Sequence, residues 1–148
     1  MKKNWYCLFA TMMAVVMCVG FTSCGDDDDE GGSVDVTVAN LVGTWQLQSE
    51  EEYDEDGDLE EKGSPSEPIY VHFNADNTGC EYERDEDDWW TNPFTYTLNG
   101  NTLTYGKGSN EIVTLTTSQL VLKYTYSYGG WCIERYKKVS DSVIAGAK

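Results

Sequence analysis

Few side chains in this sequence of 148 residues could carry out catalysis. His72 is the one histidine, and Cys80 is a cysteine that could pair with it as thiol and base. Nucleophilic catalysis also needs a third group that orients the base, and the sequence supplies no candidate for it. Structural zinc takes four Cys or His ligands, whereas the predicted domain offers His72, Cys80 and Cys132. We therefore expect no enzyme, no cofactor and no metal ion.

The acidic run at residues 50–61 suggests calcium, because hard cations bind several carboxylate oxygens. Asp54, Asp56 and Asp58 have the alternate spacing of an EF-hand loop. Glycine, however, comes at the fourth position of that loop instead of the sixth, and Pro65 comes at the twelfth. The run is not an EF-hand. An irregular calcium site is the alternative to a solvated loop, which is the usual state of a block of like charges.

Aromatic residues stand beside acidic ones in two predicted loops. Trp89 and Trp90 follow the acidic residues 85–88, and Tyr128 and Trp131 flank the second loop. An aromatic face next to a carboxylate suits a cationic group, through the charge and the ring quadrupole together, and it also suits a sugar. The predicted ligand-binding residues are Trp89, Trp90, Tyr96, Tyr124, Tyr128 and Trp131.

The elements that must position these residues are predicted to be short strands. From Leu41 onward, apolar and polar residues alternate in short segments between turn residues, as in Phe94, Tyr96 and Leu98, and no stretch has a helical period. Eight such strands in sequence predict an all-β fold, an up-and-down antiparallel barrel that closes on itself. The predicted strands are residues 41–49, 69–74, 79–84, 93–98, 102–106, 111–116, 119–126 and 131–139.

The connections between these strands are predicted to be of two kinds. Residues 75–78, 99–101 and 117–118 have the composition of tight hairpin turns, and the other connections are longer. Because alternate connections of a meander lie at opposite ends, we expect a closed end with tight turns and an open mouth with long loops. An eight-stranded barrel is only just wide enough to be filled by side chains. A barrel plugged by Trp89, Trp90 and inward-facing tyrosines is therefore the alternative to one with a cavity.

The tripeptide Gly43-Thr44-Trp45 stands at the head of the first predicted strand. It resembles the Gly-x-Trp signature of the lipocalins and of the lipocalin-like domains of bacterial lipoproteins. The resemblance implies a calycin-type barrel over residues 41–139, in which Trp45 caps the closed end and Arg135 of the last strand covers it. We expect a binding module with its ligand at the open end. The alternative is a structural or surface-interaction protein with a filled barrel.

The N-terminal residues have the order of a secretory signal, with two lysines, an uncharged run and small polar residues before Cys24. The segment from Phe21 to Cys24 resembles the lipobox of bacterial lipoproteins, whose cysteine is acylated. The acidic run after it resembles the tract that sends some Gram-negative lipoproteins to the outer face of the outer membrane. An uncleaved anchor and a secreted protein with a solvated linker are the alternatives. The expected segments are a signal peptide over 1–23, an acidic tether over 24–40, the barrel over 41–139 and a tail over 140–148.

The charge balance narrows the class of partner. The chain has 26 acidic and 10 basic residues, and loss of Lys2 and Lys3 with the signal would leave 8 minus 26, or −18. A field of this sign repels nucleic acid and anionic lipid headgroups. We expect a monomer that contacts the membrane through lipidated Cys24 and that binds a small molecule, a sugar or a cationic ligand.

Two cysteines follow Cys24, and the predicted topology keeps them apart. Cys80 follows a tight turn at the closed end, whereas Cys132 follows a long loop at the open end. The offset is about one strand length, ~17–20 Å, while a disulfide needs Cα atoms within about 7 Å. We predict two unpaired thiols, with Cys80 facing the core beside Tyr82.

Overall fold

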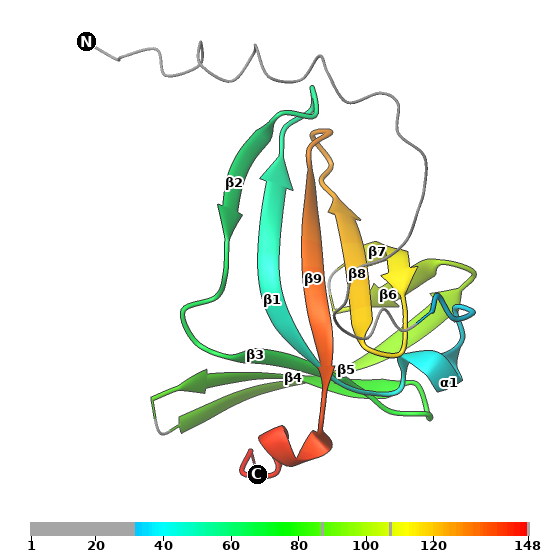
Figure 1. Ribbon diagram of the computed structural model, residues 1–148, viewed down its shortest axis with the longest axis vertical. Helices are drawn as coiled ribbons and strands as arrows, with labels where there is room; N and C mark the ends of the chain where they lie inside the picture. The colour runs from blue at the N-terminus through cyan, green and yellow to red at the C-terminus, as the bar shows by residue number, and fades with distance from the viewer. Residues whose placement is uncertain (1–31, 87, 107, 148) are drawn as a thin grey trace, which may run out of the picture.

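The computed structural model describes residues 32–86, 88–106 and 108–147, and Figure 1 shows how their strands are arranged. Every pairing between these strands is antiparallel. In chain order the elements are α1 (Val38–Leu41), β1 (Gly43–Tyr53), β2 (Leu59–Gly63), β3 (Ile69–Phe73), β4 (Thr78–Asp85), β5 (Asp88–Asn99), β6 (Thr102–Tyr105), β7 (Gly108–Leu115), β8 (Gln119–Thr125), β9 (Trp131–Val139) and the 3-10 helix η1 (Asp141–Ile144).

Eight of these strands form a closed barrel. β1 and β3 to β9 pair in chain order, and β9 pairs back onto β1, from Val139 opposite Thr44 to Trp131 opposite Tyr53. The structure thus confirms the prediction of an all-β, eight-stranded, up-and-down antiparallel barrel. All eight predicted strands are present, β9 with the predicted boundaries and the other seven with shifted ones.

A ninth strand, β2, extends the barrel wall along β1. It pairs with the second half of β1, where Glu50 lies opposite Gly63, while β3 pairs with the first half, where Gly43 lies opposite Phe73. The prediction of a loop over 50–68 is therefore wrong for much of its length. In a run of acidic residues, the side chains on the two faces of a strand are of the same type. The sequence therefore shows no alternation of apolar and polar residues that would predict a strand.

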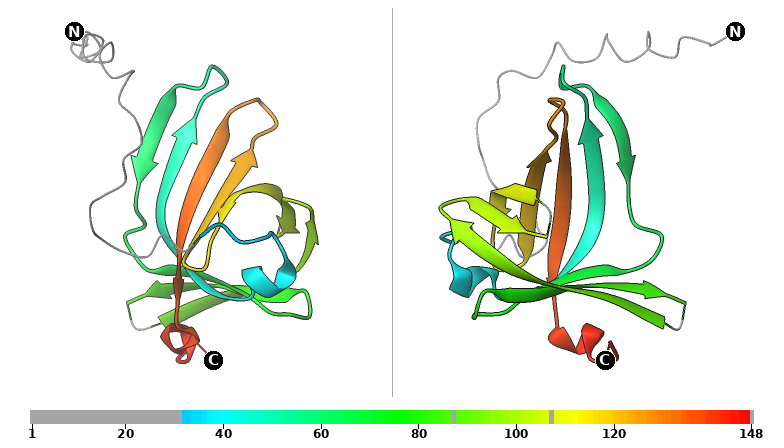
Figure 2. Two further views of the ribbon diagram at one scale, coloured as in Figure 1. Left: turned by 45° about the vertical axis from the view of Figure 1, so that its right-hand side comes forward. Right: turned by 180° about the vertical axis from the view of Figure 1, so that it is seen from behind.

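The connections predicted to be long are mostly tight. β4 and β5 stay paired as far as Asp85 and Asp88, and β6 and β7 as far as Tyr105 and Gly108. The β4–β5 hairpin continues beyond the barrel as a two-stranded arm, which both views of Figure 2 show. The predicted division into a tight-turn end and a long-loop end is wrong, because short hairpin loops accept many compositions.

An apolar core fills one end of the barrel, the closed end. The Phe73 ring makes edge-on contacts with Phe94, Tyr96 and Tyr105, at centroid distances of 5.7, 5.2 and 5.7 Å. Helix α1 adds Leu41, which is fully buried. Burial of a large apolar side chain stabilises a fold by ~1.5–3 kcal/mol. The buried cluster consists of Leu41, Trp45, Leu47, Val71, Phe73, Tyr96, Leu103, Ile112, Leu115, Leu120, Leu122 and Tyr136.

The segment before β1 packs on the barrel. The backbone N–H of Val34 donates to the carbonyl of Leu115 at 3.1 Å, and Val34, Val36 and Val38 pack against the core. The predicted tether over 24–40 is therefore wrong in its last part. Its three valines at alternate positions are a strand-like pattern that buries one face of the segment.

The remaining predicted segments lie at the two ends of the chain. The tail predicted over 140–148 contains η1, which lies beside β3 (Figure 1). The predicted signal peptide over 1–23 and the lipidation at Cys24 fall outside the described residues. Within the described ranges, the structure has no helix with the length and apolarity needed to cross a membrane.

Candidate functional site

A cavity of about 380 Å³ opens at the end of the barrel opposite the core. Small-molecule sites have volumes of about 300–1,000 Å³, so this cavity suits a small ligand. Residues of β1, of β4 to β9 and of two turns line it. They are Glu50, Glu52, Glu81, Asn92, Tyr105, Gly106, Gly108, Asn110, Tyr124, Tyr126, Cys132 and Glu134.

Four glutamates line this cavity, and none of the lining residues that the structure describes is Lys, Arg or His. Glu50 of β1 lies directly opposite Glu134 of β9 in the strand register, an arrangement that is unfavourable for like charges. Burial raises the pKa of the Glu134 carboxyl above its ordinary value, and the charges of Glu50 and Glu81 raise it further.

Hydroxyl and amide groups hold three of the four carboxylates in place. The Tyr126 hydroxyl donates to Glu52 Oε1 at 3.1 Å, and the Tyr136 hydroxyl donates to Glu134 Oε2 at 2.9 Å. The Asn92 amide donates to Glu81 Oε2 at 2.8 Å. These donors are neutral, so they orient the carboxylates without cancelling their charge.

Cys132 lies buried between the glutamates. Its Sγ and one carboxylate oxygen each of Glu50 and Glu134 all lie within 4.8 Å of one another. Burial raises the pKa of the Cys132 thiol to about 11, with smaller contributions from Glu134 and Glu50. At neutral pH the thiol is therefore protonated, which makes it a weak nucleophile.

Cys80 lies on the other side of the wall. Cys80 and Cys132 are both free thiols, as predicted. The prediction that Cys80 faces the core beside Tyr82 is wrong, because its strand neighbour Gly79 takes the inward position. A Cβ at Gly79 would lie 2.4 Å from the Phe94 ring, so the inward position here accepts glycine alone. The alternation of β4 therefore runs from Gly79 to Glu81, which lines the cavity.

Tyrosines form the aromatic wall of the cavity. Tyr124 lines it as predicted, together with Tyr105 and Tyr126, which the prediction of ligand-binding residues missed. Tyr128 is 68% exposed and its ring stacks on that of Tyr126 at 5.0 Å, so it stands at the rim. Tyr96 does not line the cavity, since it is buried in the core and donates its hydroxyl proton to the Asn74 carbonyl at 2.6 Å.

The three tryptophans predicted to bind ligand do not line the cavity. Trp89 packs on the outer face of the wall, with its ring centroid 6.1 Å from that of Tyr70. Trp131 stacks on Tyr53 at 5.4 Å, and Trp90 is 55% exposed on the β4–β5 arm. The predicted gathering of these residues at the mouth is wrong, because strands occupy the positions where long loops were expected.

The glutamates and Cys132 are the residues that the prediction missed. An alternation signal for them does exist in the sequence: Cys132, Glu134 and Tyr136 share one face of β9, and Glu50 and Glu52 share one face of β1. Glu51 between them points outward and binds Lys62 and Arg135, at 2.7 and 3.1 Å. Those two partners lower the pKa of the Glu51 carboxyl to about 2.

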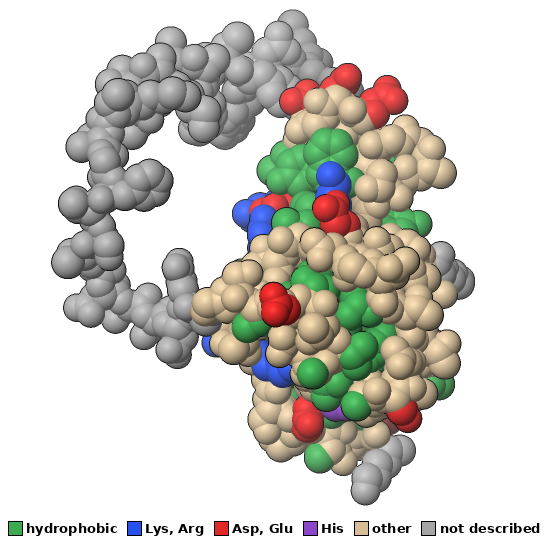
Figure 3. Space-filling view, turned by 90° about the vertical axis from the view of Figure 1, so that its right-hand side faces the viewer, with side chains coloured by type: hydrophobic (Ala, Val, Ile, Leu, Met, Phe, Trp, Pro, Cys, Tyr) green, Lys and Arg blue, Asp and Glu red, His purple; other side chains and the backbone are tan. Residues whose placement is uncertain are grey.

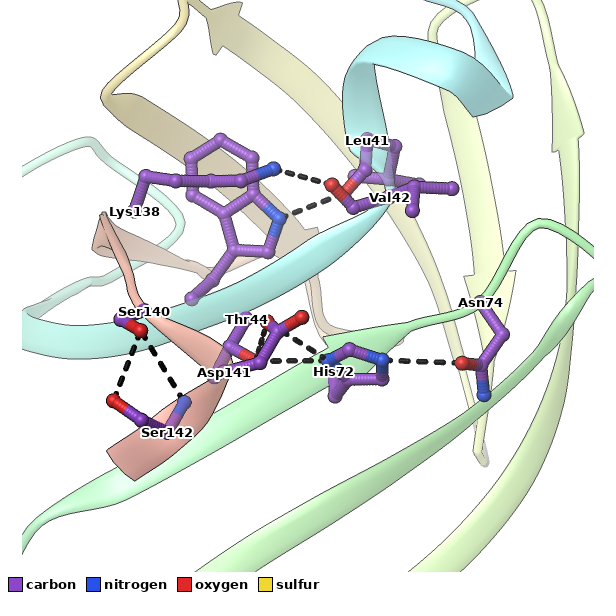
Figure 4. Close-up of polar contacts among 10 residues, drawn as sticks. Leu41, Val42, Thr44, His72, Asn74, Lys138, Ser140, Asp141 and Ser142 are labelled. Carbon is purple, nitrogen blue, oxygen red and sulfur yellow. Dashed lines mark hydrogen bonds and ion pairs between the residues drawn. The ribbon is translucent and has the colours of Figure 1, made fainter. Parts of the chain in front are cut away.

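At the closed end, Trp45 is fully buried and Lys138 covers it (Figure 4). The indole N–H donates to the Leu41 carbonyl at 2.8 Å. The Lys138 ammonium lies 4.3 Å from the ring centroid and donates to the Val42 carbonyl. The prediction of Arg135 as the cover is wrong, because Lys138 is the residue of β9 opposite Trp45 in the register.

Gly43 makes room for this cover. Its φ of +118° is a conformation that favours glycine, and a Cβ there would lie 2.8 Å from the Lys138 Cε. The first residue of the Gly-x-Trp motif therefore serves both the turn of the chain into β1 and the seat of the lysine.

Thr44, His72 and Asp141 form a polar cluster beside Trp45 (Figure 4). A hydroxyl, an imidazole and a carboxylate are also the groups of a catalytic triad, but this hydroxyl cannot be reached by a substrate. The Thr44 hydroxyl lies 2.8 Å from His72 Nδ1 and donates to Asp141 Oδ1 at 2.6 Å, while His72 Nε2 lies 3.1 Å from Asn74 Oδ1. Thr44 is fully buried, so no substrate reaches its oxygen. His72 lies on the outer face of β3, where its contact with Asp141 of η1 leaves its side chain 18% exposed. The cluster fastens η1 to the barrel.

The remaining acids of the 50–61 run form a turn. Asp54 Oδ1 accepts hydrogen bonds from the backbone N–H groups of Asp56 and Asp58, at 3.0 and 2.8 Å. This carboxylate thus stabilises the β1–β2 turn. Figure 3 shows acidic side chains gathered at the upper tip of the molecule, where this turn lies.

Comparisons with known proteins gave a match to a family and matches to solved structures. The profile of the lipocalin-like domain family matches residues 41–122. A redesigned beta barrel is similar over 74% of this chain and 100% of its own, with 16% identity and a TM-score of 0.37. A protein of unknown function from the DUF3598 family of Nostoc punctiforme is similar over 71% of this chain and 50% of its own, with 9% identity and a TM-score of 0.37. No curated protein sequence matches significantly. The chain belongs to the lipocalin-like domain family.

Proposed function

We propose that this protein is a non-catalytic binding module that takes up a small molecule in the cavity at the open end of its barrel. A lipocalin-like barrel suggests a binding module in general. The observation that carries the proposal is the cavity of about 380 Å³, lined by aromatic rings and polar groups that converge on it from seven strands. Such a combination is typical of small-molecule sites.

The chemistry of the lining residues supports binding over catalysis. The Cys132 thiol is protonated at neutral pH because its pKa is raised to about 11. His72 lies at the closed end, next to Thr44 and Asp141. Cys132 and His72 are therefore at opposite ends of the barrel. Cys80 does lie opposite His72 in the register of β3 and β4, but its thiol donates to the Glu81 carbonyl at 3.3 Å, while the imidazole contacts Thr44, Asn74 and Asp141.

We also propose that the protein acts at the cell envelope, as an outer-membrane lipoprotein exposed at the surface. The support is the segment from Phe21 to Cys24, with its resemblance to a lipobox, and the acidic run that follows it. Acyl chains at Cys24 would hold the chain at the lipid, and a hydrated acidic segment would keep the barrel away from it.

Native mass spectrometry of the protein purified from its own host tests the binding function. We expect a co-purifying small molecule in the wild type. Asn92→Trp, which fills the cavity without a change of charge, should lose this molecule. Thr91→Trp is the matched control, because Thr91 is exposed on the opposite face of the same strand. A molecule retained by Asn92→Trp, or no molecule in any variant, would contradict the proposal and favour a structural protein.

A further inference from the structure

We propose that the ligand of this cavity is a small organic cation, a protonated amine held by Glu50, Glu52 and Glu134. This inference rests on the proposed function and adds the chemical class of the ligand. It is carried by the charge, the geometry and the size of the cavity.

The distribution of charge across the wall is the first observation. Glu51 on the outer face has two basic partners, Lys62 and Arg135. Its neighbours Glu50 and Glu52 line a cavity whose described lining residues include four glutamates and no basic residue. Glu50 is exposed at the mouth of the cavity, whereas burial disfavours the charged form of Glu134, and a bound cation would offset that cost.

The positions of the carboxylates suit one ammonium group. Oxygens of Glu50 and Glu134 lie within 4.8 Å of each other, so a nitrogen between them can lie at ~2.7–2.9 Å from both, the length of a charge-assisted hydrogen bond. Tyr126 takes up one lone pair of Glu52 and leaves others free. An ammonium group has three donors and no acceptor, which matches a site made of acceptors.

The size and the walls of the cavity favour an organic cation over a bare metal ion. Glu50, Cys132 and Glu134 form a donor set of the kind that metals use. A metal would have to displace the proton of the Cys132 thiol, whose pKa burial raises to about 11. The volume of about 380 Å³ leaves room for a carbon body beside the rings of Tyr105, Tyr124 and Tyr126. Aromatic faces attract cations through their quadrupole.

Three probes with the same phenylethyl group and different charge test the inference: 2-phenylethylamine, 2-phenylethanol and 3-phenylpropionate. Titration calorimetry on the purified protein at pH 7.5 should show the amine binding at least tenfold more tightly than the alcohol, and no binding of the carboxylate. The double change Glu50→Gln with Glu134→Gln should weaken amine binding at least tenfold. Glu51→Gln is the matched control and should leave amine binding unchanged, because Glu51 faces outward between the two. Thermal melts of each variant verify that it is folded.

The outcomes separate this inference from the proposed function. Equal binding of alcohol and amine, lost in Asn92→Trp, would overturn the cation and leave the binding module intact. Binding of zinc chloride without binding of the amine would overturn it in favour of a metal site. No binding of any probe would also overturn it, and the co-purifying molecule then decides whether the binding function stands.

Discussion

Glu50, Glu51 and Glu52 are three identical residues in a row with two different environments. Glu51 has a lowered pKa on the outer face because of its basic partners, while its neighbours line a cavity whose most buried carboxyl, that of Glu134, has a raised pKa. The environment on each side of the wall therefore decides what a glutamate does for stability.

Substitution of Glu134 tests how a carboxyl with a raised pKa affects the stability of the fold. Its folded-state pKa is above the unfolded value, so the folded state binds the proton more tightly and its stability falls as pH rises through the raised pKa. We expect Glu134→Gln to raise the urea midpoint at pH 7.5 and to have little effect well below pH 4.5. A lower midpoint at pH 7.5 would show that the carboxylate is stabilised by charge in the folded protein.

Substitution of Glu51 tests how a carboxyl with a lowered pKa affects stability, and the expected pH dependence is the opposite of that for Glu134. Its folded-state pKa of about 2 is below the ordinary value of 4.5, so its contribution is present above pH 4.5 and is lost as pH falls toward 2. We expect Glu51→Gln to lower the urea midpoint at pH 7.5 and to leave it almost unchanged near pH 2. Equal effects at both pH values would mean that the ion pairs with Lys62 and Arg135 contribute nothing.

Gly43 leaves the space that the Lys138 side chain occupies at the closed end of the barrel. Gly43→Ala should lower the free energy of unfolding by about 1–3 kcal/mol, because a Cβ meets Lys138 and φ is positive. Gly63→Ala, with open space around it and no positive φ, should change it by less than about 0.5 kcal/mol. Urea unfolding measures both. Adding Lys138→Ala to Gly43→Ala should recover part of the loss, and no recovery would show that the backbone alone is responsible.

At the scale of elements, η1 is held to the barrel through a few polar contacts. Asp141→Ala removes the acceptor of the Thr44 hydrogen bond and the partner of His72. A hydrogen bond to a charged group contributes ~1.5–3 kcal/mol, so hydrogen exchange of the described residues after Val139 should accelerate by roughly tenfold or more. Glu83→Ala, at an exposed position of β4, is the control. Unchanged exchange would show that the segment is held by packing alone.

The elements also show how far the sequence predicts the fold. Strands with apolar and polar residues in alternation, such as β8, are evident because their two faces differ chemically. β2 is not, since its residues Leu59–Gly63 are all exposed and carry no alternation. The lengths of the connections depend on how far pairing continues past the barrel wall, which the composition of a turn does not record. For that reason the prediction of an open mouth surrounded by long loops is wrong.

The candidate site could also be predicted only in part from the sequence. Tyr124 and Trp45 lie where their strands predict, because each strand starts with a clear apolar face. Arg135 lies on the outer face of β9 with Glu51, whereas Lys138 lies on the inner face with Tyr136 and opposite Trp45. Alternation along β9 separates these two faces, but which inner residue lies opposite Trp45 depends on the register with β1, and no pattern within a single strand fixes that register.

For the whole molecule, the anchor is the feature with the largest expected effect. Cys24→Ala should abolish incorporation of a fatty-acid analogue and release the protein from the membrane fraction, because stable anchoring requires two acyl chains or an equivalent second signal. Ser23→Ala, which leaves the cysteine in place, is the control. Equal labelling of wild type and Cys24→Ala would contradict the lipoprotein proposal.

The open edge of β2 bears on how copies of this protein meet. β2 pairs with β1 and, within the ranges that the structure describes, with no other strand. A free strand edge invites a second chain to add its own strand, which is the first step of β-sheet aggregation. Here the edge is short and carries Glu60, Glu61 and Lys62, all exposed, on a chain with a net charge of −16. Charge repulsion along that edge therefore keeps neighbouring copies apart, even where many of them crowd on one surface.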